Sequence, residues 1–443
     1  MKFFPKINKT GNKQKILSNV MWAMGGKIVN MIGNLFVGIL VARYLGPEQY
    51  GVMNYVISYV ALFSIIATFG LSNIEVRELS RSLKDRDTIM GTCFRLRLFF
   101  ASMGYSLIFL TLLLFRTDVF TSAMILVYGL VLYTGCFEVI RNYFTSIVYN
   151  EYVVKSEICR TVVGAVVKIG LLWIKAPLEY FIIATMFDTI LVSSGYIVSY
   201  QNKVGRLLDW KYDRTKVSYY LKQAFPLVLS GAAVIIYQRI DQVMIGNMID
   251  KQSVGYFATA SRFLEIILFL PHVLSQTVTP MLVKTYKDKP YEQYEEKARQ
   301  FVSIVVWSSI IMALVVSLSS NWLISLTFGG KYVAAIPVLQ ILAFKTVGMA
   351  LSSSGGQLII IEKIQKWAFV RNILGCVVCV SLNYLLIPYY GIIGSAFVTI
   401  ITLLVSGCLS NAFIPSYRHI FRIEIYALIN GWKHLAYLKQ FVK

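Results

Sequence analysis

Arg239 and Asp241 lie two positions apart inside a long apolar stretch, within "YQRIDQVMIG" at 237–246. A charge on a helix at the centre of a bilayer costs about 2.5–3.5 kcal/mol on insertion scales, so such a side chain normally faces a cavity or a polar partner. Side chains two positions apart point to nearly opposite sides of a helix, so these two cannot neutralise each other. We therefore expect different roles: Arg239 suits the binding of a phosphate group, and Asp241 suits coupling to a proton or a sodium ion.

An ion pair between helices, with no role in transport, is the alternative interpretation of each residue. The candidate partners of Asp241 are Arg262, on the next apolar segment, and Lys345, on the tenth segment of the chain. Lys345 also precedes the glycine pair at 355–356, which can loosen a helix. Irregular backbone inside a membrane requires contact with protein or water, so we expect Lys345 to face a cavity.

A polar stripe runs along the first apolar segment. Lys27, Asn30 and Asn34 follow the spacing i, i+3, i+7, which places them on one face of a helix. Lipid would not tolerate such a stripe, whereas a water-filled cavity would. The alternative for Lys27 is that it lies near the cytoplasmic end of the segment and extends its ammonium group to the membrane surface.

Two further acidic residues lie within apolar segments. Glu265 follows Arg262 by three positions, so the two can pair on their own helix, and a structural pair and a gating role both remain open. For Asp188, an ion site and a hydrogen bond between helices also remain open. The candidates for substrate binding are thus Lys27, Asn30, Asn34, Arg239, Arg262 and Lys345, and those for ion coupling are Asp188, Asp241 and Glu265. We expect no catalytic residue, metal ligand or cofactor apart from a coupling proton or sodium ion.

The elements that must position these residues are membrane-spanning helices. Of the 443 residues, 57% are hydrophobic and only 15% are charged, whereas a soluble protein of this length has about a quarter charged. Runs of about 20 apolar residues are typical of bilayer-spanning helices. Twelve such segments are expected, at 17–41, 50–70, 98–115, 119–140, 158–174, 178–200, 219–248, 255–281, 300–327, 333–361, 367–387 and 391–414.

The basic residues indicate how these segments are oriented. Of the 43 Lys and Arg residues, 33 lie in the termini and in the connections after the even-numbered segments, including their flanks. The connections after the odd-numbered segments hold five: Arg43, Arg116, Lys175, Lys251 and Lys331. Because cytoplasmic loops of membrane proteins are enriched in Lys and Arg, this bias predicts that both termini are cytoplasmic. It also accounts for most of the net charge of +21 without a nucleic-acid partner.

A weak internal repeat suggests two halves. Aligning Gly51 with Gly255, at an offset of 204 residues, matches the apolar segments on both sides. We therefore expect an all-α integral membrane protein with about 12 transmembrane helices in two pseudo-symmetric six-helix bundles. The expected regions are a basic N-terminus at 1–16, one bundle at 17–200, a cytoplasmic linker at 201–218, a second bundle at 219–414 and an amphipathic cytoplasmic tail at 415–443. Hydrophobic residues at helical spacing predict that this tail lies on the membrane surface.

Several short motifs carry a resemblance to a known family. They are "RYLGPEQYG" at 43–51, "IDQVMIG" at 240–246, "FGGKY" at 328–332 and "IPYYGIIGSA" at 387–396. Together and in this order, they resemble those of bacterial polysaccharide repeat-unit flippases. These are the Wzx-type O-antigen and capsule transporters of the MATE-like multidrug/oligosaccharidyl-lipid/polysaccharide exporter superfamily. The resemblance covers essentially the whole chain.

The resemblance implies a fold and a cargo. The expected fold is a V-shaped pair of six-helix bundles with a central cationic cavity. The expected cargo is an oligosaccharide repeat unit on a polyprenyl diphosphate, moved from the inner to the outer leaflet of the bacterial cytoplasmic (inner) membrane. O-antigen lipopolysaccharide, capsule or exopolysaccharide would be the product, and the polysaccharide polymerase of the same pathway is a possible partner besides the lipid bilayer. The motifs are mainly markers of the fold and do not specify substrate contacts residue by residue.

The residues themselves favour a transporter of an anionic cargo. Basic groups outnumber acidic groups within the apolar segments, and no phosphate-binding G-x-x-x-x-G-K-[ST] motif occurs. Transport would therefore use a substrate gradient, an ion gradient or the membrane potential, and we expect alternating access around a fixed cationic site. Two alternatives are an ion-coupled exporter of small molecules and, less favoured because the outer connections are short, a membrane polymerase or ligase of the same pathway.

Overall fold

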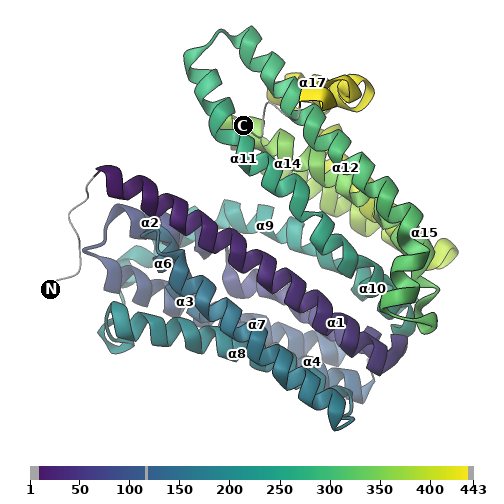
Figure 1. Cartoon of the computed structure of the whole chain (residues 1–443). Coiled ribbons are helices and arrows are strands. Elements are labelled where there is room, and N and C mark those ends of the chain that lie inside the picture. The colour runs from purple at the N-terminus through teal and green to yellow at the C-terminus, as the bar shows by residue number, and fades with distance from the viewer. Residues whose placement is uncertain (1–8, 115–117, 438–443) are drawn as a thin grey trace. The chain divides into compact units, whose positions relative to one another are not determined.

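The computed structural model describes residues 9–114 and 118–437, and all regular secondary structure in these ranges is helical (Figure 1). The expected all-α membrane fold is confirmed. The α-helices are α1 Lys9–Thr68, α2 Leu71–Arg81, α3 Arg86–Leu114, α4 Val119–Gly129, α5 Val131–Thr134, α6 Glu138–Ser146, α7 Asn150–Trp173, α8 Leu178–Lys203, α9 Arg214–Met248, α10 Lys251–Ile267, α11 Phe269–Asp288, α12 Tyr291–Thr327, α13 Ala335–Leu342, α14 Lys345–Ile361, α15 Ala368–Leu404, α16 Ser410–Phe413 and α17 Arg418–Asn430. Short 3-10 turns are η1 Gly135–Phe137, η2 Leu207–Asp209, η3 Gly330–Tyr332, η4 Gln365–Trp367, η6 Pro415–Tyr417 and η7 Gly431–Tyr437, and η5 Val405–Leu409 is a π-helix.

Eight helical stretches among the described residues are long and apolar enough to cross a membrane. Two of them, Gly25–Thr68 and Gln365–Phe413, each contain two of the expected segments. They bend at Gly46 and Gly391, whose φ angles are 74° and 56°. Glycine adopts positive φ without the steric cost of a side chain, and the nearby Pro47 and Pro388 interrupt the helical hydrogen bonding. Sharp kinks therefore replace the loops that the sequence suggested at these positions.

The remaining expected segments also lie on helices. Segment 158–174 lies in α7, segment 255–281 in α10 and α11, and segment 333–361 mostly in α13 and α14. Three parts of the expected regions lie outside the described residues: 1–8, position 115 and 438–443. The cytoplasmic location of both termini stays a prediction, because it depends on the charge bias alone.

The chain divides into two compact units. Unit 1 comprises the described residues up to Val41 together with Tyr59–Val228, and unit 2 comprises Ala42–Ser58 together with Leu229 and the residues after it. The expected bundles had their boundary in the linker at 201–218. In the structure, the turn at 42–58 lies with unit 2, and the start of α9 lies with unit 1.

Two glycines explain why the turn at 42–58 lies in unit 2. A Cβ atom added to Gly51 would lie 1.7 Å from the carbonyl oxygen of Lys251, and one added to Gly255 would lie 1.9 Å from the carbonyl oxygen of Pro47. These distances are far below van der Waals contact, so only glycine permits the approach of the two backbones. The contact is reciprocal, because Gly51 and Gly255, and likewise Pro47 and Lys251, are related by the same offset of 204 residues.

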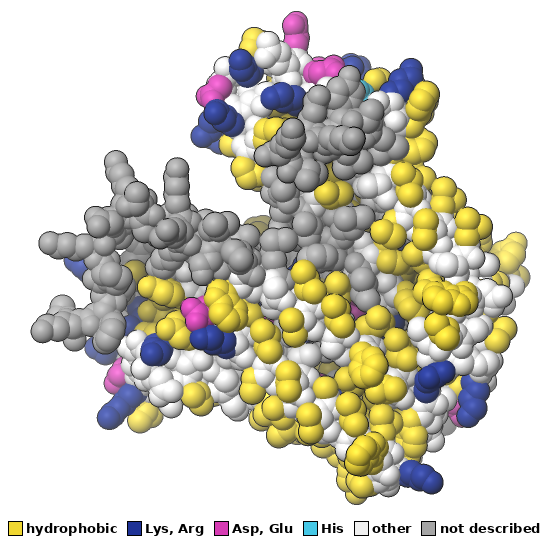
Figure 2. Space-filling view, in the orientation of Figure 1, with side chains coloured by type: hydrophobic (Ala, Val, Ile, Leu, Met, Phe, Trp, Pro, Cys, Tyr) yellow, Lys and Arg dark blue, Asp and Glu magenta, His cyan; other side chains and the backbone are white. Residues whose placement is uncertain are grey.

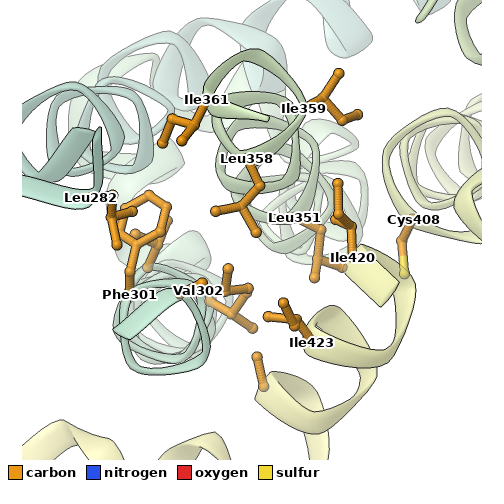
Figure 3. Packing of buried hydrophobic residues seen from close by; sticks show 14 of the residues in the cluster. Leu282, Phe301, Val302, Leu351, Leu358, Ile359, Ile361, Cys408, Ile420 and Ile423 are labelled. Atoms are coloured by element: carbon orange, nitrogen blue, oxygen red, sulfur yellow. The ribbon is translucent and has the colours of Figure 1, made fainter. Parts of the chain in front are cut away.

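Each unit has its own apolar core. In unit 2, buried side chains from α11, α12, α14 and α17 pack together, among them Phe301, Leu358 and Ile423 (Figure 3). In unit 1, the core includes Leu71, Tyr143 and Tyr200. Hydrophobic side chains also cover much of the visible outer face of the helices, while Lys and Arg side chains gather toward helix ends (Figure 2). Apolar outer faces suit helices that are surrounded by lipid.

The C-terminal amphipathic helix packs against protein. Ile420, Ile423 and Ala427 of α17 are buried, and the helix contacts α12 and α14. The indole Nε1 of Trp307 on α12 donates a hydrogen bond to the carbonyl oxygen of Ala427 at 2.9 Å. Phe421, Ile425 and Leu428 of the apolar stripe are partly buried against the core of unit 2, while Trp432 is exposed, and the location of the tail on the membrane surface stays a prediction.

Candidate functional site

Asp241 lies in a buried polar cluster inside unit 2. Its side chain is on α9 and the residue is only 3% exposed. Its Oδ1 accepts hydrogen bonds from Asn383 Nδ2 at 2.7 Å and from the Cys379 thiol at 3.4 Å, and its Oδ2 accepts one from Thr399 Oγ1 at 2.8 Å. All three donors are on α15, because the kink at Gly391 turns this helix back so that both of its arms reach the same carboxyl group.

The cluster contains oxygen atoms that have no hydrogen-bond partner. Within the described chain, Asn383 Oδ1, Ser395 Oγ and Thr402 Oγ1 are buried and unpaired. A buried polar atom without a partner costs about 1–3 kcal/mol, and Asn383 Oδ1 belongs to the same amide group that donates to Asp241. Carboxylate, amide and hydroxyl oxygens are the donors that hard cations prefer. The arrangement can hold a proton on Asp241 or a small cation among these oxygens.

The neighbouring cations do not pair with Asp241 at close range. Lys345 on α14 acts electrostatically on the Asp241 carboxyl group, and Arg239 in turn repels Lys345. Both side chains are half-buried, and across the part of the chain that the structure describes neither forms a hydrogen bond or a salt bridge. The divergence that the i, i+2 spacing predicts for Arg239 and Asp241 is therefore observed. Neutral donors on α15, rather than Arg262 or Lys345, are the direct partners of Asp241.

Arg262 belongs to a different cluster in unit 2. Its Nε donates to the hydroxyl oxygen of Tyr50 at 3.3 Å, and its Nη1 lies 3.6 Å from Glu265 Oε2. The pairing expected from the i, i+3 spacing is thus confirmed, although the Glu265 side chain is 56% exposed. Tyr50 also packs edge-to-face on Tyr332, whose hydroxyl donates to the carbonyl oxygen of Ala42 at 2.7 Å. Arg262 therefore helps to stabilise the turn at 42–58.

The polar stripe of α1 lies in unit 1. Lys27 and Asn34 are exposed. Asn30 is partly buried and joins α1 to α7, because its Nδ2 donates to Glu157 Oε2 at 3.3 Å and its Oδ1 accepts a hydrogen bond from Thr161. The three residues share one face, as expected, but Asn30 is held by a contact between helices.

Asp188 forms an ion pair in unit 1. Its Oδ2 accepts a hydrogen bond from the ammonium group of Lys168 on α7, and both side chains are 16% exposed. A polar cavity of about 10 Å³, large enough for one water molecule, adjoins the pair and is also lined by Asn34, Arg160 and Thr161. A hydrogen bond between helices, one of the two interpretations of Asp188, is thus observed, with Lys168 of α7 as the donor. Its ammonium group occupies the position at which a cation would otherwise approach the carboxylate.

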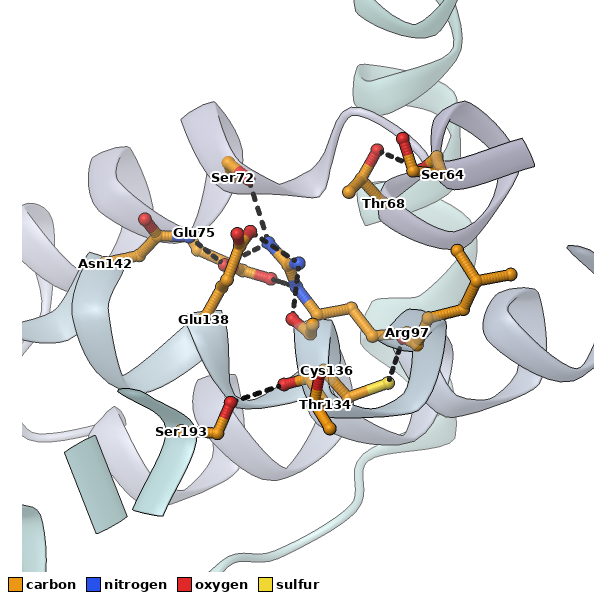
Figure 4. Close-up of polar contacts among 12 residues, drawn as sticks. Ser64, Thr68, Ser72, Glu75, Arg97, Thr134, Cys136, Glu138, Asn142 and Ser193 are labelled. Carbon is orange, nitrogen blue, oxygen red and sulfur yellow. Dashed lines mark hydrogen bonds and ion pairs between the residues drawn. The ribbon is translucent and has the colours of Figure 1, made fainter. Parts of the chain in front are cut away.

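A buried charge cluster in unit 1 was not expected from the sequence (Figure 4). Arg97 is 1% exposed and Glu75 is 0% exposed, and two hydrogen bonds of 2.7 and 3.0 Å join them. Arg97 also contacts Ser72 and Glu138, and Asn142 donates to Glu75. We had counted Arg97 among the cytoplasmic loop charges. A bidentate, fully partnered arginine of this kind holds helices together, and it leaves no group open for a ligand.

Comparisons with known proteins agree with this architecture. The profile of the family described as "Polysaccharide biosynthesis protein" matches residues 16–286, and the MatE profile matches residues 226–385. The capsular polysaccharide biosynthesis protein CapF of Staphylococcus aureus is 25% identical over 49% of this chain and 54% of CapF. The probable low-salt glycan biosynthesis flippase Agl15 of Haloferax volcanii is 22% identical over 43% of this chain and 40% of Agl15. The matched region thus spans about half of the length of these relatives.

Solved structures show the same fold. The lipid II flippase MurJ, in an inward closed conformation, superimposes with a TM-score of 0.70 at 17% identity and covers 94% of this chain and 92% of MurJ. An inward-facing multidrug resistance MATE family transporter of the MOP superfamily gives a TM-score of 0.63 at 17% identity, with 93% and 96% covered. At such identities the likeness concerns the fold. The profile match over more than half of the sequence identifies the chain as a member of the polysaccharide biosynthesis protein family.

Proposed function

We propose that the protein moves a polyprenyl-diphosphate-linked oligosaccharide from the inner to the outer leaflet of the bacterial cytoplasmic membrane, by alternating access. The names of the relatives support this proposal, since one concerns capsular polysaccharide and the other a glycan flippase. The product would be a surface polysaccharide such as O-antigen, capsule or exopolysaccharide. A polymerase that extends the delivered repeat units is the partner that such a pathway requires.

The observation that carries the proposal is the environment of the two cationic side chains, Arg239 and Lys345. Two cations lie near each other within the apolar part of unit 2, and among the described residues neither has a hydrogen-bonded acidic partner. Repulsion between the two cations and loss of water oppose this arrangement; Asp241 offsets part of the cost for Lys345, and a bound anion would offset more. A diphosphate supplies two negative groups, and a guanidinium group binds phosphate oxygens in a bidentate manner.

Other candidates have smaller parts in the proposal. Lys27 and Asn34 are exposed polar groups on α1 and suit contacts with sugar hydroxyl groups. Asn30 and Arg262 hold helices and turns in place, so we assign them positioning roles. Among the ion-coupling candidates, Asp241 is favoured because of its unpaired oxygen neighbours. Asp188 has Lys168 as its counter-ion, and Glu265 is exposed beside Arg262.

An ion-coupled exporter of small molecules is the second candidate function. The MatE profile covers residues 226–385. This range includes Asp241 on α9 and most of the first arm of α15. A cationic small molecule would be repelled by Arg239 and Lys345, so the electrostatics favour the anionic lipid-linked cargo.

Translocation in proteoliposomes tests the proposal. Flipping of a fluorescent undecaprenyl-diphosphate oligosaccharide would be compared for the wild type, Arg239→Gln, Lys345→Gln and the control Lys366→Gln, which removes an exposed cation on η4. We expect each site variant to lose tenfold or more in rate, because each removes a charge-assisted phosphate contact worth about 1.5–3 kcal/mol. Arg239→Lys should recover part of the rate. Normal flipping by both site variants at normal membrane levels would contradict the proposal.

A further inference from the structure

Helix α17 carries a buried carboxyl group at its contact with unit 2. Glu424 is 0% exposed, on the face that also buries Ile420 and Ala427. The Nδ2 of Asn411 on α16 donates to both carboxyl oxygens of Glu424, at 3.1 and 2.9 Å. On the opposite side, a Cβ added to Gly355 of α14 would lie 2.1 Å from Glu424 Oε1. The carboxyl group is therefore enclosed between α14 and α16, without access to water.

The cation nearest to Glu424 is occupied elsewhere. Arg371 on α15 donates from Nε to the carbonyl oxygen of Ser406 and from Nη2 to that of Gly407, both at 2.9 Å. These carbonyl groups belong to the π-helix η5, where the usual helical hydrogen bonding is altered. Within the described chain, Glu424 has no salt bridge shorter than 4.0 Å. An ionised Glu424 is thus stabilised by the Asn411 amide, the Cys408 thiol and the more distant Arg371.

The surroundings suit the protonated form of Glu424. Asn411 Oδ1 is buried and, among the described residues, unpaired. A neutral carboxylic acid has one O–H donor, whereas a carboxylate has none. Rotation of the Asn411 amide would let protonated Glu424 donate to Oδ1 and accept from Nδ2, so that both polar groups of the amide would be satisfied.

A second polar contact holds the start of α17. His419 Nε2 lies 2.6 Å from Glu362 Oε2 at the end of α14, and Tyr294 of α12 donates to Glu362 Oε1 at 2.9 Å. The Glu362 side chain is only 7% exposed. This contact joins the start of α17 to the end of α14.

Other charged or titratable groups also face α17, among them His434 of η7, whose Nε2 lies 3.4 Å from the hydroxyl oxygen of Tyr426. The helix α12 presents Arg299, which stacks on Tyr426 at 5.2 Å and pairs with Glu295. The same helix presents Ser303 and Trp307, which do not titrate in this range. The π-helix contributes the Cys408 thiol, and α15 contributes Arg371.

We propose that α17 is a pH-dependent clamp on unit 2, which docks firmly when Glu424 is neutral and loosens as the pH rises. The charge bias of the sequence predicts that α17 lies on the cytoplasmic side, so the clamp would respond to cytoplasmic pH. Such a response stands independently of the cargo. It would tie the mobility of unit 2 to the metabolic state of the cell.

The direction follows from the linkage between protonation and docking. Burial raises the pKa of Glu424 from its ordinary value of 4.5 to about 7. A raised carboxyl pKa means that docked α17 binds the proton more tightly than free α17 does. Its contribution to docking is therefore fully present below about pH 4.5, and it is lost as the pH rises to about 7. Between pH 6 and 8, the equilibrium constant for docking of α17 should fall about tenfold.

Hydrogen exchange of the full-length protein in lipid nanodiscs tests the clamp. Protection factors of residues 418–430, corrected for the intrinsic exchange rate, would be measured at pH 6, 7 and 8. We expect a decrease of about tenfold in the wild type. In Glu424→Gln, a neutral analogue of the protonated acid, the decrease should shrink to less than threefold. The matched control Glu292→Gln, at an exposed position on α12, should behave as the wild type.

Two results would overturn the clamp. One is wild-type protection of α17 that stays constant from pH 6 to 8, a measurement that needs no variant and therefore does not depend on the folding of one. The other is a decrease in Glu424→Gln equal to that of the wild type. His419→Gln provides the second variant: it removes the contact with Glu362 but keeps Glu424, so we expect the tenfold decrease to remain.

Discussion

The two units each bury an aspartate within apolar helices, but they supply it with different partners. In unit 1, Asp188 meets the ammonium group of Lys168, so positive and negative charge cancel locally. In unit 2, Asp241 meets the neutral donors Asn383 and Thr399. Its cationic neighbours stay outside hydrogen-bonding distance. An aspartate with its own counter-ion is a structural link, whereas one that lacks it is open to a proton or a cation.

The most severe test of this contrast is Asp241→Asn. The substitution keeps the shape of the side chain but removes its charge, so we expect the ion dependence of transport to weaken by about 5- to 150-fold, the usual range of coupling between two sites. Transport in proteoliposomes with imposed proton or sodium gradients measures it. Unchanged ion dependence would show that the two aspartates do not differ in the proposed way.

Asp188→Asn should lower the stability of the protein and should not act through the ion dependence of transport. Removal of one partner from a buried ion pair leaves Lys168 uncompensated, and after allowance for the 16% exposure of both side chains we expect a loss of about 2–3 kcal/mol in the free energy of unfolding. Thermal unfolding in detergent measures it. The double variant Lys168→Met/Asp188→Leu should regain most of the lost stability and should transport normally. If the double variant is stable but inactive, the pair in unit 1 has a role in transport.

A smaller effect is expected from Gly164→Ala on α7. The new methyl group would lie 2.1 Å from Asp188 Oδ1 and would push the carboxylate away from Lys168, with a cost of about 1–3 kcal/mol. Gly170→Ala is the matched control on the same helix, because an added Cβ meets no other atom within 4 Å there. Equal thermal stability of the two variants would mean that the ion pair adjusts freely, and that unit 1 is less rigid than the contrast requires.

The smallest effect is expected from Thr402→Val in unit 2. The substitution removes a buried, unpaired hydroxyl group, so the free energy of unfolding should change by less than about 1 kcal/mol. If this hydroxyl oxygen is a ligand of the coupling ion, the concentration of ion needed for half-maximal transport should rise about tenfold. Thr134→Val in unit 1 is the control, and it should leave that concentration unchanged. An unaltered ion requirement in Thr402→Val would restrict the ion site to Asp241, Asn383, Ser395 and Thr399.

The sequence predicted the positions of the helices well. It predicted less well which side chains from different helices contact one another. Apolar runs located the spans, and the i, i+2 spacing separated Arg239 from Asp241. Asn383 and Thr399 escaped notice because they lie 142 and 158 positions after Asp241, and hydrophobicity alone does not tell which distant helices meet. Isolated polar residues in apolar runs such as "CVSLNYLL" were the available signal.

The C-terminal helix illustrates a different limit. An amphipathic pattern states that one face of a helix avoids water, but lipid and protein satisfy that requirement equally well. The buried acid among the apolar residues of α17 was informative in retrospect. Lipid would have excluded Glu424, whereas the interior of unit 2 accommodates it beside Asn411.

The glycine contact between the two repeat-related turns has an evolutionary consequence. Gly51 meets the residue four positions before Gly255, and Gly255 meets the residue four positions before Gly51, so the contact obeys a local two-fold rotation. Interfaces with this property are isologous, as in symmetric homodimers, where a single surface patch binds a copy of itself. Because both turns carry the glycine at the same position of the repeat, the contact is of the kind that a duplicated half-length sequence produces.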